Sequence, residues 1–308
     1  MNSIVLAFLL VLLLFSTTNN NFCSATPRLL ALIKPNPIVL KYHNGKLLKG
    51  NVTVNLIWYG KFTSPQKSIL VDFLQSLSPS RPPAPPSVAS WWSTTATYKG
   101  GPSNILLGKQ VVDEKYSLGK SLKDAQITAL ATKAGLGPSA VNVVLTSADV
   151  AVEDFCMNTC GTHGYTSGKK PDDKYAYAWV GNSGKQCPGQ CAWPFYKPVV
   201  GPQTPPLVAP NGDVGIDGMV INLATVLAGT VTNPFDGGYY QGADSTAGLE
   251  AVTACLGIFG SGAFPGYPGK VVVDKTSGAS YNAQGANGRR YLLPAMWDPA
   301  TSTCKTLV

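Results

Sequence analysis

Histidine is nearly absent from this sequence, whose 308 residues include only His43 and His163. This scarcity excludes most histidine-rich metal sites and leaves a Ser-His or Cys-His mechanism few candidate bases. Common catalytic and nucleotide-binding patterns are missing as well. Gly181-Asn-Ser-Gly184 is one residue short of a serine-hydrolase elbow, Gly119-Lys-Ser121 lacks the upstream glycine of a phosphate loop, and no Gly-x-Gly-x-x-Gly follows a strand. The sequence therefore favours no standard enzyme class.

Charged residues are also few, at 13% of the chain, yet 24 Lys and Arg against 16 Asp and Glu give a net charge of +8. The 32 glycines and 24 prolines indicate a loop-rich protein, while an apolar content of 44% argues against disorder. A basic surface attracts polyanions. The positive side chains are spread thinly, with Lys169-Lys170 and Arg289-Arg290 as the only adjacent pairs. We therefore expect no nucleic-acid site, and an acidic polysaccharide or an extracellular protein as the partner.

The first 25 residues have the pattern of a secretory signal peptide. An apolar block runs from Val5 to Phe15, and small residues follow it up to Ala25, where we expect cleavage. No other apolar run reaches about 18 residues, the length that spans a bilayer. The sequence thus predicts a secreted protein in the extracellular space, with no stable membrane insertion after cleavage. Its mature part, residues 26–308, is expected to form a single domain.

Cysteine usage agrees with an oxidising compartment. Of seven cysteines, Cys23 leaves with the signal peptide, and an even number remains: Cys156, Cys160, Cys187, Cys191, Cys255 and Cys304. Six cysteines allow 15 connectivities, and the sequence leaves the choice open. The two C-x3-C motifs are close enough along the chain to cross-link each other, and Cys255 and Cys304 would then hold the C-terminal tail. Asn51-Val-Thr53 is a glycosylation sequon, so we expect Asn51 on the surface.

Hydrophobic periodicity predicts an α+β domain with strands early and its longest buried helix late. Ser64 and Pro65 are expected at the N-cap and first position of an early helix. Residues 87–98 are compatible with a short helix or an aromatic-rich loop. The expected strands cover 51–60, 104–113, 140–152, 175–180, 270–274 and 290–293, and the expected helices cover 64–77, 121–135, 220–235 and 247–259.

Three groups of residues are candidates for chemistry or binding. His163 follows Cys156 and Cys160 in a pattern that would bind zinc if the thiols were reduced, but disulfides are favoured, so we expect a structural histidine, no metal and no cofactor. Asp213 and Asp217 look at first like a calcium loop, yet they have too few companions, and helix capping is the better interpretation. Trp91 and Trp92 cannot easily share one interior, so one of them is the candidate exposed aromatic for contact with a glycan.

Several stretches together resemble the plant EXORDIUM family, also called the phosphate-induced protein family. They span nearly the whole mature chain and include Tyr42-His-Asn-Gly45, Val54-Asn-Leu-Ile-Trp-Tyr-Gly-Lys-Phe62, Ser90-Trp-Trp-Ser-Thr-Thr95, Cys160-Gly-Thr-His-Gly164, Trp179-Val-Gly-Asn-Ser183, Pro265-Gly-Tyr-Pro-Gly269 and Tyr291-Leu-Leu-Pro-Ala-Met-Trp-Asp-Pro299. The resemblance implies a secreted glycoprotein of the apoplast and cell wall, linked to brassinosteroid-responsive growth and cell expansion. It implies no particular reaction.

The resemblance also bears on the charge-free stretch 220–235. Relatives with a His-Glu-x-x-Glu pattern before Thr-Asn-Pro are similar to zinc metallopeptidases, and that pattern would place its metal ligands at Thr225 and Gly229 and its base at Val226. Glu250 would match a further acid. The resemblance thus implies a metallopeptidase-like fold with a degenerate site and a non-catalytic role in binding a partner or wall glycan. Two alternatives remain open: a hydrolase that uses Asp213, Asp217 and Glu250, and a disulfide-linked structural module of the wall.

Overall fold

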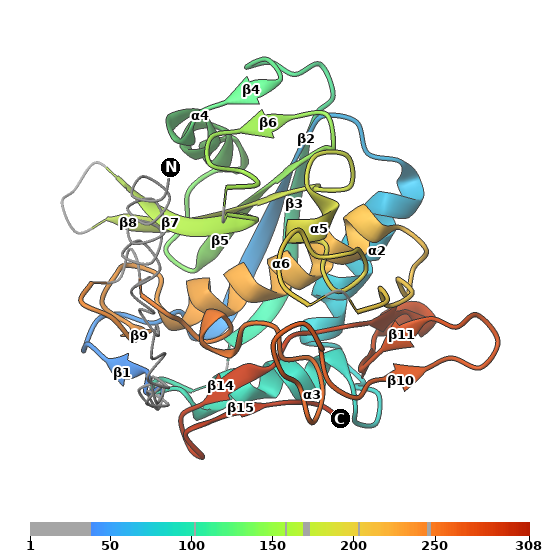
Figure 1. Ribbon diagram of the computed structural model, residues 1–308. Helices are drawn as coiled ribbons and strands as arrows, with labels where there is room; N and C mark the ends of the chain where they lie inside the picture. The colour runs from blue at the N-terminus through green and yellow to red at the C-terminus, as the bar shows by residue number, and fades with distance from the viewer. Residues whose placement is uncertain (1–37, 102, 158, 169–172, 203, 245–247) are drawn as a thin grey trace, which may run out of the picture. The chain divides into compact units, whose positions relative to one another are not determined.

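The computed structural model describes residues 38–308, except 102, 158, 169–172, 203 and 245–247. The predicted signal peptide, residues 1–25, lies outside the described residues. At the centre is a five-stranded sheet with the order β3-β2-β5-β8-β7. The first four strands run parallel, and β7 pairs with β8 in the antiparallel direction. Figure 1 shows the sheet above the long helix α6. The five strands are β2 (Gly50–Tyr59), β3 (Ser103–Asp113), β5 (Ala140–Thr146), β7 (Gly161–Ser167) and β8 (Lys174–Gly181).

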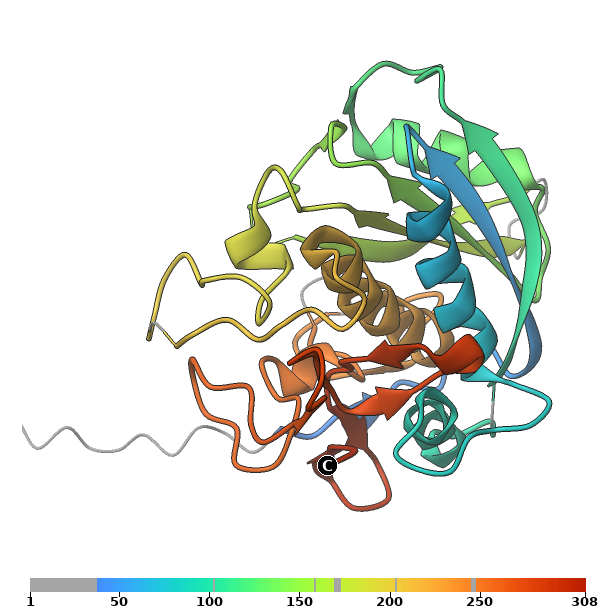
Figure 2. The same cartoon turned by 90° about the vertical axis from the view of Figure 1, so that its right-hand side faces the viewer.

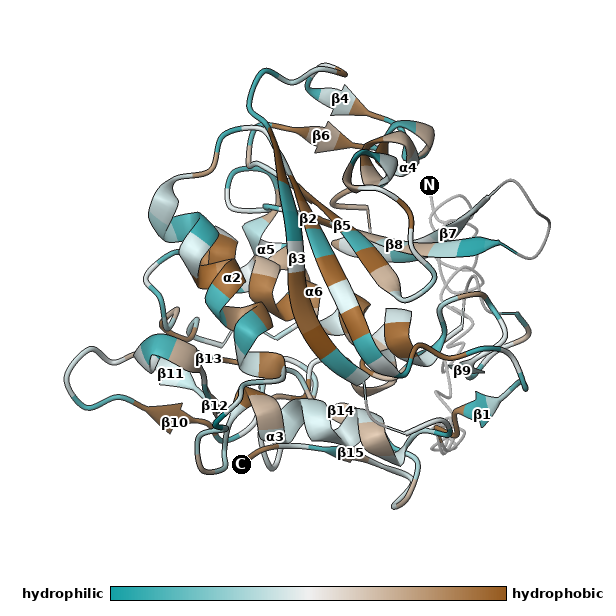
Figure 3. Ribbon diagram, turned by 180° about the vertical axis from the view of Figure 1, so that it is seen from behind, coloured by the Kyte–Doolittle hydropathy of each residue, from teal (hydrophilic) through white to brown (hydrophobic). Residues whose placement is uncertain are grey.

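Helices cover both faces of this sheet, which explains why its central strands are apolar on both sides. Helices α2 (Ser64–Leu77) and α6 (Val214–Thr232) share one hydrophobic cluster with Val54, Leu56 and Trp58 of β2. Helix α4 (Asp124–Ala131) packs against Ile57 and Tyr59 on the opposite face. Figure 2 shows α2 and α6 on one side of the sheet and α4 on the other, and Figure 3 shows brown, hydrophobic residues along β2, β3 and β5. Mixed helix and strand content thus confirms an α+β domain, and residues 38–308 form one compact unit.

The remaining elements are short. They are β1 (Lys41–Tyr42), α3 (Val88–Trp92), η1 (Ser93–Thr97), β4 (Ser121–Leu122), η2 (Thr132–Ala134), β6 (Ala151–Val152), α5 (Pro188–Cys191), β9 (Tyr239–Tyr240), η3 (Thr253–Cys255), β10 (Val272–Val273), β11 (Ser280–Tyr281), β12 (Ala283–Gln284), η4 (Ala286–Gly288), β13 (Arg290–Tyr291), β14 (Met296–Asp298) and β15 (Thr303–Lys305). Most belong to the C-terminal third, which forms two-stranded pairs such as β12–β13 and β14–β15.

Five predicted elements need correction. The N-cap of α2 is Thr63, not Ser64, because the Thr63 hydroxyl accepts the Gln66 amide in a capping box. The helix expected over 121–135 covers only 124–131 before a 3₁₀ turn, and the late strands shrink to two residues each. The helix expected over 247–259 is wrong. Leu249 instead pairs with Gln241 in a β-bridge, and only η3 is helical there.

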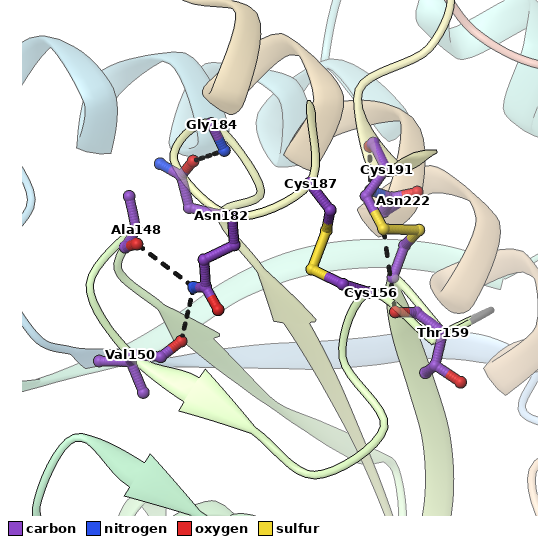
Figure 4. The surroundings of a disulfide bond; sticks show 11 residues. Ala148, Val150, Cys156, Thr159, Asn182, Gly184, Cys187, Cys191 and Asn222 are labelled. Carbon is purple, nitrogen blue, oxygen red and sulfur yellow. Dashed lines mark hydrogen bonds between the residues drawn. A yellow bond between two sulfur atoms is a disulfide. The ribbon is translucent and has the colours of Figure 1, made fainter. Parts of the chain in front are cut away.

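Three disulfides join the six cysteines of the described chain. Cys156 bonds to Cys187, Cys160 to Cys191, and Cys255 to Cys304. The expectation that the two C-x3-C motifs cross-link each other is therefore confirmed. These first two bonds attach the loop before β7 to α5, and the Asn222 side chain of α6 donates a hydrogen bond to the Cys191 carbonyl (Figure 4). The start of β7 is thereby held beside α6.

The C-terminal residues close the core around α2 and α3. Arg289 donates to Asp72 on α2 at 2.9 Å, and the Tyr291 hydroxyl donates to the Ile69 carbonyl at 3.1 Å. Farther on, the Pro294 and Trp297 carbonyls accept hydrogen bonds from Trp91 and from the Tyr98 hydroxyl. Residues near both ends of the described chain therefore share one core.

Among the described residues, only α6 is long and apolar enough to cross a membrane by length and composition. The sequence predicted no second uninterrupted apolar run of about 18 residues, and Asp217 does interrupt this one; the helix passes because its average composition is apolar. Most of the helix is buried inside the fold, which is also what the core helix of a globular domain shows.

Candidate functional site

Helix α6 positions the residues that the sequence singled out. It begins at Asp213, whose carboxylate accepts the Ile216 amide at 3.0 Å as an N-cap. It ends at Thr232, and Asn233 and Pro234 follow. Nearly all of its side chains are buried. The prediction of a helix buried on all sides is confirmed, although it starts six residues earlier than the predicted stretch.

The three predicted site positions lie on one stretch of this helix. Thr225 is half-buried, and its hydroxyl donates to the Ile221 carbonyl one turn earlier, at 2.9 Å. Val226 is 6% exposed, and Gly229 is buried. Thr225 and Val226 line an open groove, whereas Gly229 lies under a pair of polar side chains. The space beside the helix is thus filled at Gly229 and open at Thr225.

Those polar side chains are His163 of β7 and Glu250. The His163 Nε2 atom is 2.7 Å from Glu250 Oε2, and Asn233 donates to Glu250 Oε1 at 2.7 Å. A Cβ atom at position 229 would lie 2.4 Å from the carboxylate oxygen and 2.8 Å from His163 Nε2. Glycine is required there because the pair sits directly on the helix backbone. Sequence reasoning placed Glu250 at this site but not its contact with His163, for which the sequence gives no signal.

The Glu250 carboxylate holds the His163 imidazole in one orientation. When Glu250 accepts a proton from Nε2, the lone pair of the neutral ring is on Nδ1. His163 Nδ1 is buried and has no hydrogen-bond partner among the described residues. No third histidine, cysteine or acidic side chain of the described chain completes a metal cluster with it. Zinc sites use three or four protein ligands, so these two residues alone do not form one.

The open part beside α6 is an apolar groove of about 960 Å³. Its floor includes Ile221, Thr225 and Val226, and Gly161 at the start of β7 lies on it. None of the described residues that line it is charged. Four apolar side chains on its rim are largely exposed: Val199 (71%), Val200 (81%), Leu256 (87%) and Phe264 (61%). The loops that carry them lie on the same side of α6 (Figure 2).

A second, smaller cavity of about 500 Å³ has the opposite character. We call it the lysine cleft, because Lys46, Lys49 and Lys99 all line it and all three are exposed. Lys99 lies over the ring of Tyr42, with Nζ 4.9 Å from the ring centre. Within the described part of the chain, no acidic side chain lines the cleft, and none of the three lysines forms an ion pair. The cleft therefore presents three uncompensated positive charges to solvent.

Asp213 and Asp217 do not join Glu250 in one constellation. Asp217 occupies the first turn of α6, whereas Glu250 lies against Gly229, twelve residues later, or about 18 Å along the helix axis at 1.5 Å per residue. Asp217 accepts hydrogen bonds from the Asn211 amide and side chain, and burial raises its pKa to about 7. Both aspartates organise the start of the helix, as the capping interpretation predicts.

The expectation for Trp91 and Trp92 is wrong. Both are buried, at 2% and 3% exposure. Each indole finds its own acceptor: Trp91 donates to the Pro294 carbonyl and Trp92 to the Ser103 carbonyl. Neither tryptophan is available for contact with a glycan. Asn51 is exposed, which agrees with its predicted surface position, and its glycosylation stays a prediction.

Comparisons with known proteins give a consistent result. The family model described as "Phosphate-induced protein 1 conserved region" matches residues 40–307. Protein EXORDIUM-like 2 of Arabidopsis thaliana is 64% identical over 90% of this chain and 92% of its own length. Protein PHOSPHATE-INDUCED 1 of Nicotiana tabacum is 57% identical over 94% of this chain and 95% of its own length. Protein EXORDIUM of Arabidopsis thaliana is 55% identical over 98% of this chain and 100% of its own length. No solved structure matches the chain.

Proposed function

Because the chain belongs to the phosphate-induced protein 1 (EXORDIUM) family, we propose that it is a secreted protein of the apoplast and cell wall that binds an acidic wall polysaccharide. Family membership itself supports a plant growth-related protein. The predicted signal peptide and the three disulfides support secretion. In this proposal the protein promotes brassinosteroid-responsive cell expansion through binding and not through catalysis.

The observation that carries this function is the lysine cleft. Lys46, Lys49 and Lys99 line one cavity, and none of the described residues in its lining is acidic. Carboxylates on a uronic-acid chain provide opposite charges at repeated intervals, so one chain can contact all three lysines. The Tyr42 ring beside Lys99 offers an apolar face against which a sugar ring can lie. The net charge of +8 draws the polyanion toward the protein from farther away.

The test is binding to polygalacturonate, with a neutral arabinan as comparison. We expect the wild type to bind polygalacturonate and to lose affinity as salt rises, because about 0.15 M salt already screens exposed charges beyond about 8 Å. The triple variant Lys46→Gln, Lys49→Gln, Lys99→Gln should lose most of this binding. A matched variant changes Lys115, Lys185 and Lys275, which are exposed elsewhere and carry the same total charge, and should keep it. Equal losses in both variants, or equal binding to arabinan, would refute the cleft as the binding site.

A hydrolase of metallopeptidase-like fold is the second candidate function. It is favoured by one observation: His163 of β7 contacts Glu250 beside Gly229 of α6, and an open groove begins one turn earlier on this helix at Thr225 and Val226, where the resemblance implied a site. In this interpretation the helix is the scaffold of a degenerate centre, with Thr225, Val226 and Gly229 in place of the ligands and base. Metal analysis of dialysed protein, with zinc added beforehand, decides between the two candidates. Zinc bound at one equivalent and lost in a His163→Ala variant would favour the hydrolase over the binding protein.

A further inference from the structure

The edge strand β7 carries backbone groups that no other described strand uses. The Gly181 amide at the end of β8 points toward β7 and donates to the Cys160 carbonyl. The next amide, that of Asn182, points in the opposite direction and donates to the Thr146 carbonyl of β5. Because ladder bonds alternate along an antiparallel pair, every second residue of β7 turns its amide and carbonyl to β8. The residues of β7 whose backbone groups point away from the sheet are therefore Gly161, His163, Tyr165 and Ser167. Apart from a long contact of 3.3 Å from the Thr162 hydroxyl to the His163 carbonyl, no described residue bonds to these outward groups.

This free edge meets the apolar groove. Gly161 belongs both to β7 and to the lining of the groove, and Thr225 and Val226 of α6 form its floor next to that point. The groove continues to the exposed rim residues Leu256 and Phe264. A row of unpaired backbone groups and a large exposed apolar patch are each typical of an interaction surface, and here they are continuous.

We propose that an extended, uncharged peptide segment of a partner protein binds here, adding a strand to β7 and placing an apolar side chain in the groove. Unpaired amides and carbonyls at alternate residues fit another backbone, and an apolar molecule without amides would leave them unsatisfied. The described residues of the groove lining carry no charge, although the whole chain carries +8, so a charged segment would lose hydration there without gaining a partner. Pairing with Gly161, His163 and Tyr165 requires about five extended residues, or about 17 Å of chain.

This inference does not depend on the lysine cleft. The cleft recognises charge through lysines of the loop between β1 and β2 and of the loop after η1, whereas the β7 edge recognises backbone and apolar side chains. Salt separates the two experimentally, since high salt weakens contacts between exposed charges and strengthens apolar burial.

The test begins with a phage-displayed library of random decapeptides, selected on the disulfide-intact protein in about 0.5 M salt, which screens exposed charges beyond a few ångströms. We expect the enriched sequences to be neutral, to alternate apolar and polar residues, and to lack proline in the pairing stretch. The best peptide is then synthesised with a fluorophore and titrated against the protein. A second version carries N-methyl groups on alternate amides, which block strand pairing but keep every side chain.

Two variants probe the two halves of the surface. Tyr165→Pro removes one outward amide, a change that an edge strand tolerates, and Tyr165→Ala controls for loss of the ring. Leu256→Asp places a charge on the rim, and Val273→Asp, at another exposed valine (55%), controls for charge alone. We expect Tyr165→Pro, Leu256→Asp and N-methylation each to weaken binding at least about tenfold, which corresponds to about 1.4 kcal/mol. Both control variants should bind like the wild type.

The proposal fails if no peptide is enriched. It also fails if the N-methylated peptide binds as well as the parent, because the groove would then accept apolar groups without strand addition. If Tyr165→Pro does not fold, as judged by near-UV circular dichroism, the N-methylated peptide still decides the question on the wild-type protein.

Discussion

His163 Nε2 and Glu250 Oε2 lie 2.7 Å apart, and both atoms sit directly on the backbone of Gly229. The two residues are 87 positions apart in sequence, so the pair fixes the segment around Glu250 against α6. Asn233, which follows the last residue of that helix, holds the other carboxylate oxygen. The end of α6, the edge strand β7 and the loop before η3 are joined at this point.

Gly229→Ala should destabilise the protein. Alanine favours a helix by about 1 kcal/mol over glycine, but overpacking against two fixed polar groups costs about 1–3 kcal/mol. Denaturant unfolding should therefore show a net loss of stability. On a Glu250→Ala background the closer of the two obstructing groups is gone and His163 has lost its partner, so the same change should cost less. An equal loss in both backgrounds would show that the pair does not press on the helix.

Stability should fall between pH 4 and pH 7 through Asp217. Burial raises the pKa of this carboxyl to about 7 in the folded protein, above its ordinary value of 3.8. In this window the folded state holds a proton that the unfolded state has released, so each rise of one pH unit disfavours folding by about 1.4 kcal/mol. The stabilisation that Asp217 contributes is complete below the pKa of this carboxyl in the unfolded chain, and it is lost as pH rises through its pKa in the folded protein. Unfolding free energies at pH 5 and pH 8 should differ less in Asp217→Asn than in the wild type, and an unchanged difference would contradict this assignment.

Loss of the Cys255–Cys304 bond should weaken the fold strongly. The bond joins residues 49 positions apart, and closing a loop of that length is worth about 4 kcal/mol by the chain-entropy relation. It also holds β15, where Cys304 lies opposite Trp297 of β14. The double variant Cys255→Ser, Cys304→Ser should melt well below the wild type. A melting temperature within about 2 °C of wild type would mean that β14 and β15 hold the tail unaided.

Trp91 should contribute to stability and not to glycan binding. Its indole is buried and donates to the Pro294 carbonyl at 2.7 Å. Trp91→Ala should therefore cost about 3–5 kcal/mol in unfolding free energy, while the folded variant keeps its affinity for polygalacturonate. Trp193→Ala, at a half-buried tryptophan of the groove, is the matched comparison and should cost less. A folded Trp91→Ala protein with weakened polysaccharide binding would restore the glycan role.

The sequence predicted the elements that depend on residues close together in the chain. Strands such as 51–60 and the buried helix α6 follow from apolar periodicity, and the disulfides follow from an even cysteine count in a predicted secretory chain. The failures concern non-local choices. Leu249 pairs with Gln241 instead of continuing a helix, and Trp91 and Trp92 both enter the interior because two separate carbonyls accept their indole protons.

The candidate site was partly within reach of the sequence. Glu250 and the positions 225, 226 and 229 followed from the resemblance, and the structure places them on or beside one helix. The contact with His163, the free edge of β7 and the lysine cleft did not follow, because each joins segments that only the fold brings together. The cleft shows this plainly, because the fold brings Lys99 to Lys46 and Lys49, about fifty residues earlier in the chain.

The hydrogen bonds between α2 and the last strands have a consequence for synthesis. Asp72 pairs with Arg289, and the Ile69 carbonyl with Tyr291, more than two hundred residues later. On the ribosome, helix α2 and its sheet emerge long before the residues that seal them. At about 5–20 residues per second this delay is about 10–40 seconds. During that interval Asp72 and the Ile69 carbonyl of α2 lack their native partners, so this part of the core is completed only when Arg289 and Tyr291 have been made.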